Sequence, residues 1–268
     1  MQLEGKRVVI TGASQGIGAA LARAFAEAGS RVVLAARSVD KLEALAAETG
    51  GAAHPVDLLD DEQTEGFIAA VESSHGPIDV LVNNAGIETS ESAATTDVAT
   101  IRDVVRLNVE APMVLTRSVL PGMLERRSGH LVFLSSLAGT ASFPTMSHYA
   151  ATKAAVTNFA GSVRWETRKH GVGVTIVAPG PVDTDMWDRV EELEGGAGNV
   201  RHRFEHLQLL PKLAPDDLAE QTVDAVRSGK RHVRHPKRLS TQFWLNEAPR
   251  RIVEAALTGV RYDPTERR

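Results

Sequence analysis

A β-branched run that passes through three glycines into an alanine-rich segment is the feature that most constrains the fold of this chain. Residues 8 to 11 are typical of a buried strand, and Gly12, Gly16 and Gly18 follow before a helical pattern begins. Glycines let the backbone turn sharply and approach a ligand closely, and a helix N-terminus offers N–H groups and a positive dipole end. The segment therefore predicts a strand, a tight turn and a helix that hold a pyrophosphate. Its GxxxGxG spacing differs from the more common GxGxxG.

A tyrosine and a lysine stand four residues apart, at Tyr149 and Lys153. In a helix this spacing places both side chains on one face. A nearby ammonium group favours phenolate, so it is expected to lower the tyrosine pKa from its usual value of roughly 10. The pair therefore predicts a tyrosine that exchanges protons with a ligand. A buried tyrosine beside a solvated lysine remains the structural alternative.

Four further segments, spread over the rest of the chain, complete a pattern with these two. They are Asn83 to Gly86, Asn108 in a helical stretch, Ser135 and Ser136 at the end of a strand, and Pro179-Gly180 followed by Thr184. With them the chain resembles the short-chain dehydrogenase/reductase family, in its classical subgroup, from about residue 5 to residue 235. The resemblance implies Ser136, Tyr149 and Lys153 as catalytic residues, with Asn108 completing a proton relay through water.

The same residue types suit the reduction of a ketone. Hydride must reach the carbonyl carbon while the oxygen gains a proton, and Tyr149 is the predicted proton donor. The Ser136 hydroxyl could hydrogen-bond the same oxygen and polarise it, and no G-x-S-x-G turn surrounds it to make it a nucleophile. Lys153 is expected to lower the Tyr149 pKa and to bind the ribose of the nicotinamide half of a cofactor. For Asn108, the alternative is a helix residue satisfied by a local backbone bond.

The end of the second predicted strand, residues 31 to 36, indicates which cofactor is bound. NAD-selective proteins commonly place an acidic residue there, on the ribose 2′-hydroxyl, whereas this chain has Ala36 followed by Arg37. A guanidinium group can bind a 2′-phosphate through paired hydrogen bonds, so NADP (NADPH) is predicted over NAD. Two observations leave an alternative open: Arg37 could be a solvated residue at a helix start, and Gln15 lacks the basic charge often found at its position.

Cofactor and substrate contacts are carried over from the resemblance by position. The cofactor is expected to touch Gly12, Ser14, Gln15, Gly16, Ile17, Gly18, Arg37, Asp57, Leu58, Asn84, Ala85, Gly86, Tyr149, Lys153, Pro179, Gly180, Val182 and Thr184. The substrate is expected to touch Ser136, Leu137, Phe143, Met146, Tyr149, Pro181, Met186 and Trp187. Most of the second set are apolar, which predicts a hydrophobic ketone, aldehyde or alcohol as substrate, although core packing is an equally good explanation for each of them.

Strands alternate with helical patterns along the 268 residues, which predicts an α/β fold. We expect a single-domain Rossmann fold at 1–235, with a doubly wound, seven-stranded parallel sheet and helices on both faces. The expected helices are 17–28, 40–48, 61–74, 98–126, 147–170 and 215–228. The expected strands are 7–11, 31–36, 52–57, 79–83, 130–135, 172–178 and 231–234.

Composition narrows the class of protein further. The chain has no Cys, which removes disulfides and thiolate chemistry, and no metal site is expected because His202 and His206 lack a third ligand. A net charge of −4 gives no support for nucleic-acid binding. The chain opens without a secretory signal and has no apolar run of membrane-spanning length, so we expect a cytoplasmic protein.

Residues 236–268 extend beyond the minimal family pattern and are expected to pack on the body or on a neighbouring subunit. A basic cluster precedes the aromatic segment Phe243-Trp244 in this region. Closure of the substrate pocket and peripheral contact with an anionic membrane are the alternatives. Relatives are often oligomeric, so a homo-oligomer, either a tetramer or a dimer, is expected.

The overall prediction is an NADP(H)-dependent oxidoreductase that interconverts a hydrophobic carbonyl compound and its alcohol. Two other functions remain open. One is an NADP-binding regulatory or scaffold protein without turnover, and the other is a non-redox reaction, such as epimerisation or dehydration, on the same fold.

Overall fold

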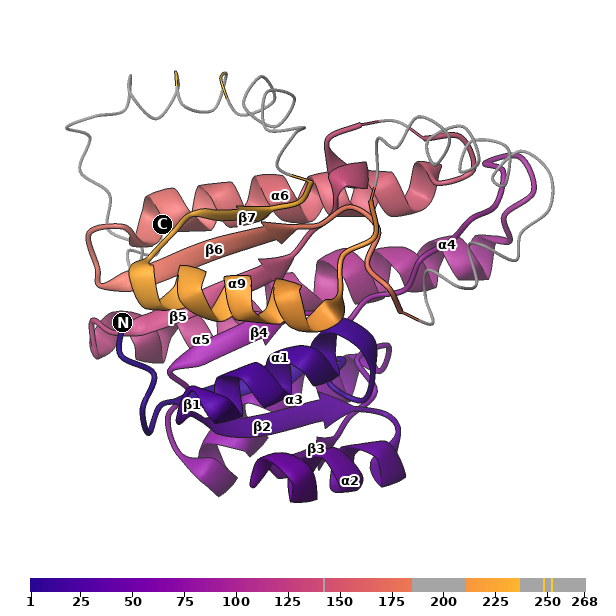
Figure 1. Ribbon diagram of the computed structural model, residues 1–268. Helices are drawn as coiled ribbons and strands as arrows, with labels where there is room; N and C mark the ends of the chain where they lie inside the picture. Colours follow the sequence, from indigo (N-terminus) through magenta and orange to yellow (C-terminus); the bar gives the residue numbers. More distant parts are fainter. Residues whose placement is uncertain (142, 185–210, 237–247, 249–251, 253–268) are drawn as a thin grey trace.

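A seven-stranded sheet forms the centre of the molecule. The computed structural model describes residues 1–141, 143–184 and 211–236, together with Ala248 and Ile252. In sheet order the strands are β3 (Ala52–Pro55), β2 (Arg31–Ala36), β1 (Arg7–Thr11), β4 (Val80–Asn83), β5 (Gly129–Leu134), β6 (Val172–Ala178) and β7 (His232–Arg234), and every pairing is parallel. The predicted doubly wound parallel sheet is confirmed (Figure 1).

Helices cover both faces of this sheet. One face carries α1 (Gly16–Glu27), α2 (Val39–Thr49) and α9 (Pro215–Ser228), and α1 and α9 lie side by side (Figure 1). The other face carries α3 (Asp61–His75), α5 (Ala111–Glu125) and α6 (Ser147–Thr167), and α4 (Val98–Val105) runs into α5. The right-handed crossovers of parallel strands require helices on both faces, so each strand is buried from both sides.

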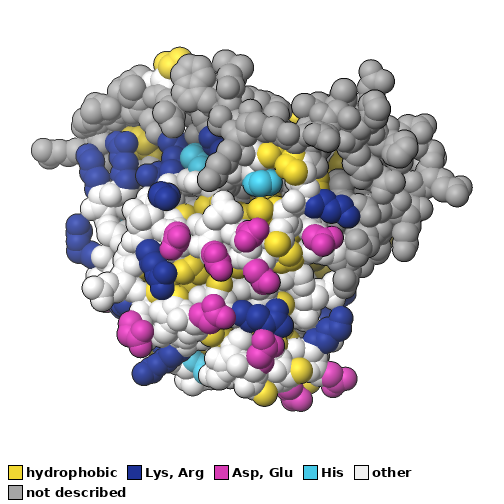
Figure 2. All heavy atoms as spheres, viewed as in Figure 1, with side chains coloured by type: hydrophobic (Ala, Val, Ile, Leu, Met, Phe, Trp, Pro, Cys, Tyr) yellow, Lys and Arg dark blue, Asp and Glu magenta, His cyan; other side chains and the backbone are white. Residues whose placement is uncertain are grey.

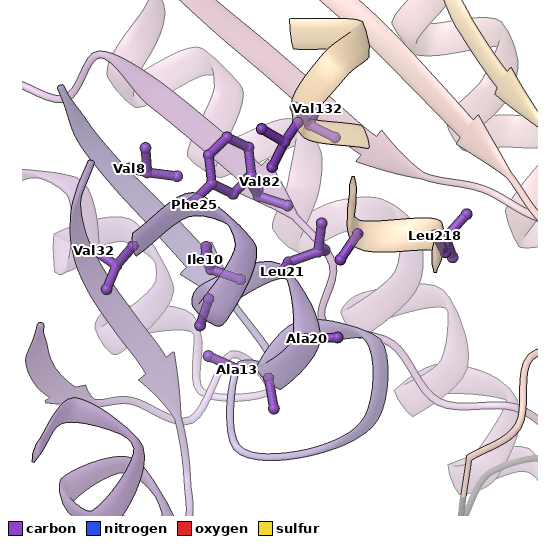
Figure 3. Close-up of a cluster of buried hydrophobic side chains, with 14 of the residues drawn as sticks. Val8, Ile10, Ala13, Ala20, Leu21, Phe25, Val32, Val82, Val132 and Leu218 are labelled. Carbon is purple, nitrogen blue, oxygen red and sulfur yellow. The ribbon is translucent and has the colours of Figure 1, made fainter. Parts of the chain in front are cut away.

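The strands divide their side chains between two hydrophobic clusters. On β1, Val8 and Ile10 pack under α1 and α9, whereas Val9 between them packs on the opposite side, under α3 and α5. Figure 3 shows Phe25 of α1 pointing at Val8, Val82 and other strand residues. Phe25 is fully buried, which is worth about 1.5–3 kcal/mol for a side chain of this kind. The alternation of side chains fixes the register of the central strands.

The strand order reverses at β1, which pairs with β2 on one side and β4 on the other. At such a reversal the connecting chains leave in opposite directions, so a crevice opens at the carboxyl ends of the strands. The turn after β1 and the segment after β4 meet there. The topology thus selects one edge of the sheet for ligand binding.

The helix expected at 98–126 is interrupted, which corrects that prediction. A π-helical turn, Arg106–Glu110, separates α4 from α5. Pro112 has no N–H to donate to the carbonyl of Asn108, four residues earlier, so the α-helical ladder cannot pass this position in its usual register. Two other predicted elements end two or three residues early, since α6 ends at Thr167 and β3 at Pro55.

The C-terminal extension lies almost entirely outside the described residues, so its predicted packing stays a prediction. Within the described parts of the chain, no helix has both the length and the apolarity to cross a membrane. On the face seen in Figure 2, acidic and basic side chains are interspersed over the body of the domain.

Candidate functional site

A cavity of about 1370 Å³ opens at the carboxyl edge of the sheet. Its wall is built from the turn after β1, the ends of β2 and β4, the segment after β5, the start of α6 and the segment after β6. A dinucleotide and a small substrate fit in a space of this size.

Thr11 and Asn84 join the carboxyl ends of β1 and β4. The amide nitrogen Nδ2 of Asn84 donates to the carbonyl oxygens of Thr11 (2.8 Å) and Gly12 (3.1 Å). In return, the Thr11 hydroxyl accepts from the backbone N–H groups of Asn84 and Ala85, both at 3.0 Å. These bonds hold the glycine turn against the segment after β4, so both border the cavity in a fixed geometry.

The glycine turn leaves no room for side chains. Gly12 has φ +65°, and a Cβ there would come within 2.8 Å of the Ala85 Cα. A Cβ on Gly18 would collide with the Gly12 carbonyl oxygen. Gln15 precedes α1 without forming a side-chain cap, so the first N–H groups of this helix are not taken up by a capping side chain. The turn and helix start leave backbone N–H groups and space in which a pyrophosphate fits.

Two cations stand near the end of β2. Arg37 is exposed and lines the cavity directly after Ala36. Lys41, in the first turn of α2, donates from Nζ to Oε1 of Gln15 over 3.0 Å. Sequence reasoning missed Lys41, because its contact crosses from one βα connection to the next. Gln15 carries no charge itself, but it holds a charged group beside the turn.

Tyr149, Lys153 and Ser136 come together on one wall. Lys153 is buried, donates from Nζ to the Leu134 carbonyl oxygen at 2.8 Å, and lies 5.5 Å from the centre of the Tyr149 ring. The Ser135 hydroxyl bonds to the Lys153 carbonyl oxygen at 3.0 Å, which anchors α6 to the end of β5. The helical face predicted from the four-residue spacing is therefore turned into the cavity.

The pKa values in this group differ from the sequence-based expectation. Burial raises the pKa of Tyr149 to about 12, against the lowering effect of a hydrogen bond with Ser136, and the negative charge of Glu88 raises it further. Burial also lowers the pKa of Lys153 to about 8. Lys153 is not among the groups that set the Tyr149 pKa, and burial of the phenol outweighs any lowering by the ammonium charge. The expectation that Lys153 lowers the Tyr149 pKa is wrong for the protein without nucleotide.

Asn108 supports the wall from behind and is not part of the cavity lining. Its amide donates to the Ile87 carbonyl oxygen (2.8 Å) and to the Thr152 hydroxyl (3.1 Å), and its Oδ1 accepts from the Ile87 N–H (2.9 Å). A Cβ on Gly86 would lie 3.0 Å from that Oδ1 and 3.4 Å from Nζ of Lys153. Asn108 thus joins the segment after β4 to α6, and these contacts span distant elements instead of one local helix bond.

All other predicted site residues that the structure describes line the same cavity. They are Ser14, Gly16, Ile17, Asp57, Leu58, Asn84, Ala85, Gly86, Leu137, Phe143, Met146, Pro179, Gly180, Pro181, Val182 and Thr184. Met186 and Trp187 lie outside the described residues.

The cavity also has a polar wall that the sequence did not reveal. It consists of Glu88, Thr89 and Ser90 after β4, with Thr100 and Asp103 of α4. Glu88 follows the Asn83 to Gly86 segment by two residues, which is the one signal that could have identified it. Among the described residues, no three His, Asp or Glu side chains are grouped to hold a metal ion.

Comparison with known proteins gives consistent matches. The family model described as short chain dehydrogenase matches residues 6–195. The chain is 34% identical over 234 residues to Dehydrogenase/reductase SDR family protein 7-like of Drosophila melanogaster, covering 84% of this chain and 71% of that protein. It is 40% identical over 185 residues to Ketoacyl reductase HetN of a Nostoc species, covering 67% of this chain and 64% of that protein.

A solved structure of a short-chain dehydrogenase from Sphingobium yanoikuyae in complex with NADPH superposes with a TM-score of 0.79. It is 25% identical and covers 97% of this chain and 100% of that one. Several curated relatives are longer, and the chain spans 58% of the bovine family member 7B. The family model matches well over half of the chain, along the segments that build the cavity. The chain therefore belongs to the short-chain dehydrogenase/reductase family of oxidoreductases.

Proposed function

We propose that this protein is an NADP(H)-dependent oxidoreductase that interconverts a ketone or aldehyde and its alcohol. The observation that carries the proposal is the placement of Ser136, Tyr149 and Lys153 on one wall of a cavity whose other end is the glycine turn. The NADPH complex of the Sphingobium relative and the ketoacyl reductase name of the Nostoc relative support it.

Residues along the cavity suit each part of NADP(H). The glycine turn and the start of α1 would hold the pyrophosphate, and Lys153 would donate to the nicotinamide ribose. Arg37 would bind the 2′-phosphate, with Lys41 adding a second positive charge beside Gln15. When bound, NADPH supplies a hydride with its two electrons and is oxidised to NADP⁺.

The protein side chains handle the oxygen of the substrate. The Ser136 hydroxyl would donate a hydrogen bond to the carbonyl oxygen and polarise it. The Tyr149 hydroxyl would give its proton to the same oxygen as the carbon receives hydride, so that one C–H bond and one O–H bond form. A Tyr149 pKa of about 12 keeps the phenol protonated at neutral pH, which suits a proton donor. Asn108 acts as a positioning residue, since it holds Ile87 and Thr152 in place.

The first test is a fluorescence titration with NADPH and with NADH, followed by an NADPH-oxidation screen over ketones and aldehydes. Tighter binding of NADPH and oxidation dependent on a carbonyl compound are expected. Cofactor binding without any turnover would favour a regulatory protein, and absence of binding to both nucleotides would refute the proposal.

The proposed preference for NADPH over NADH can be tested by removing the positive charges near the end of β2. Removing the Arg37 charge with Arg37→Ala should weaken NADPH about 10- to 100-fold, the usual effect of losing a hydrogen bond to a charged group, while NADH affinity stays within about twofold. Lys41→Gln should have a smaller effect of the same kind. Arg31→Gln is the control, because Arg31 is exposed at the opposite end of β2. Equal losses for NADPH and NADH would contradict the assigned phosphate contacts.

A further inference from the structure

Gln15 and Lys41 bridge two neighbouring βα connections at the rim of the cavity. Lys41, in the first turn of α2, donates from Nζ to Oε1 of Gln15, which directly precedes α1, over 3.0 Å. Gln15 lines the cavity, as do Arg37 and Ser38 after the end of β2, whereas Lys41 does not belong to the lining itself. The bond to Gln15 therefore brings to the cavity an ammonium group that would otherwise lie on the outer surface of α2.

The ammonium group of Lys41 keeps its charge in this bridge. Its partner is a neutral amide, and in the described parts of the chain no carboxylate lies within ion-pair distance of it. Glu48, two turns further along α2, is held instead by Arg23 of α1 through bonds of 2.6 and 3.1 Å. An ammonium group has three N–H donors, so two remain for an anion after the bond to Gln15.

The other groups at this end of the cavity also suit an anion. Arg37 lines the cavity four residues before Lys41 in the sequence. Ser38 lies between them, and its hydroxyl forms no cap bond to α2. A phosphate group carries up to about two negative charges at neutral pH and accepts several hydrogen bonds, so it gains from these groups together. A ribose 2′-hydroxyl is neutral and gains little from the same two cations.

Gln15 contributes position to this arrangement, and the charge comes from Lys41. Both side chains are exposed, and a lysine side chain that is free in solvent loses rotational freedom when it binds a phosphate. The bond to Gln15 restricts the ammonium group before any nucleotide arrives, so less freedom remains to be lost on binding. The glycine turn thus gains a positive charge that none of its own residues carries.

We propose that Gln15 is a positioning residue that determines cofactor choice: it holds Lys41 where the ammonium group, together with Arg37, binds the 2′-phosphate of NADPH. This inference rests on the proposed function and deepens it. It makes the selection of NADPH depend on a pair of residues from two separate connections, in which neither Gln15 nor Lys41 is sufficient alone.

A double-mutant cycle tests the pair. NADPH and NADH are titrated by fluorescence into wild type, Gln15→Met, Lys41→Met and the double variant. Lys41→Met should weaken NADPH about three- to tenfold and Gln15→Met about two- to fivefold, the range for one hydrogen bond at an exposed charge, while NADH changes less than about twofold. In the double variant the loss should equal that of Lys41→Met, because Gln15 acts only through Lys41.

Arg23→Gln is the matched control. It breaks the other side-chain connection between α1 and α2, and Arg23 is not part of the cavity lining. The ratio of NADPH to NADH affinity should stay as in wild type. Lys41→Arg, which keeps a cation that can reach Gln15, should retain most of the NADPH affinity. The inference is overturned if the losses of Gln15→Met and Lys41→Met are additive, if NADH weakens as much as NADPH, or if Arg23→Gln lowers the ratio as Gln15→Met does.

A fragment of the cofactor separates this inference from the proposed reaction. Adenosine 2′,5′-bisphosphate has no nicotinamide and differs from AMP only by the 2′-phosphate. By calorimetry, wild type should bind it about tenfold or more tightly than AMP, and Gln15→Met should reduce this ratio. That result would uphold the pair even if no carbonyl compound is reduced. Equal binding of both compounds to wild type would refute it, and would leave proton transfer by Tyr149 untouched.

Discussion

At the residue scale, burial sets the protonation of the proposed acid. Tyr149 faces Ser136, Lys153 and the carboxylate of Glu88, and the net effect is a pKa of about 12. The four-residue spacing predicted that Tyr149 and Lys153 share a helical face. It could not predict their pKa values, because burial depends on how α6 packs against the end of β5. Glu88 and Lys41 were missed for a similar reason, since their side chains act across connections that no local pattern describes.

The Tyr149 pKa can be measured directly, because the chain has two tyrosines and Tyr262→Phe leaves Tyr149 alone. Because the pKa of Tyr149 is raised, its side chain should stay protonated at a pH at which an exposed tyrosine is ionised. At about pH 10.5, above the ordinary tyrosine pKa of about 10, phenolate absorbance should be nearly absent while circular dichroism shows an intact fold.

Charge removal tests the cause of this shift. Adding Glu88→Gln to that background should lower the Tyr149 pKa and increase phenolate at the same pH, because a negative charge near the phenol is lost. Glu91→Gln should change nothing. Half-ionisation at or below pH 10 in the folded Tyr262→Phe protein would show that Tyr149 is not desolvated.

At the element scale, the glycine turn and the π-helical turn show what a sequence pattern does and does not contain. The strand, turn and helix around Gly12 to Gly18 were predictable because backbone geometry requires glycine there. The interruption at Arg106–Glu110 was not predicted, although Pro112 carried a signal, since apolar spacing continues on both sides of it. The π turn places Asn108 where it reaches Ile87 and Thr152.

Gly18→Ala tests the glycine turn as an element. The new methyl group would collide with the backbone of Gly12, so we expect a loss of about 1–3 kcal/mol in the free energy of unfolding together with impaired NADPH binding. Gly66→Ala is the matched control, because a Cβ on this exposed α3 residue meets nothing within 4 Å. It should stabilise the protein by up to about 1 kcal/mol, through helix propensity. If urea unfolding gives the same free energy of unfolding for Gly18→Ala and Gly66→Ala, the glycine turn is not closely packed at Gly18.

At the scale of the whole molecule, one end of the sheet forms the ligand cavity and the other contributes to stability. The cavity lies at the carboxyl edge. Towards the opposite edge, a buried histidine helps to connect neighbouring strands. His130 at the start of β5 bonds through Nε2 to the Thr175 hydroxyl at 2.8 Å, and that hydroxyl donates to the Lys230 carbonyl oxygen at 2.7 Å. The bonds connect β5, β6 and the approach to β7. Fold class and the position of the cavity followed from the order of elements, whereas this connection depends on tertiary packing.

The buried histidine predicts a pH dependence of global stability. Burial lowers the pKa of His130 to about 4, so the unfolded chain binds a proton between about pH 6.5 and pH 4 that the native protein does not. Stability should therefore be complete above pH 6.5 and fall as the pH decreases, by up to about 3 kcal/mol at pH 4. Urea unfolding of wild type and His130→Gln over this range checks it, since the variant should lose this part of the dependence. If the free energy of unfolding falls by the same amount with pH in wild type and in His130→Gln, His130 is not the cause.

The proposed reaction requires Tyr149 to donate the proton in an NADPH-dependent reduction. It is tested most directly by comparing wild type and Tyr149→Phe for NADPH affinity by fluorescence and for single-turnover NADPH oxidation with a ketone that wild type reduces. The phenylalanine keeps the ring in place beside Lys153, so NADPH should bind within about threefold of wild type. Oxidation should fall by about 10²-fold or more, the usual contribution of a positioned acid. A variant that binds NADPH and keeps a near-normal rate would show that Tyr149 is not the proton donor.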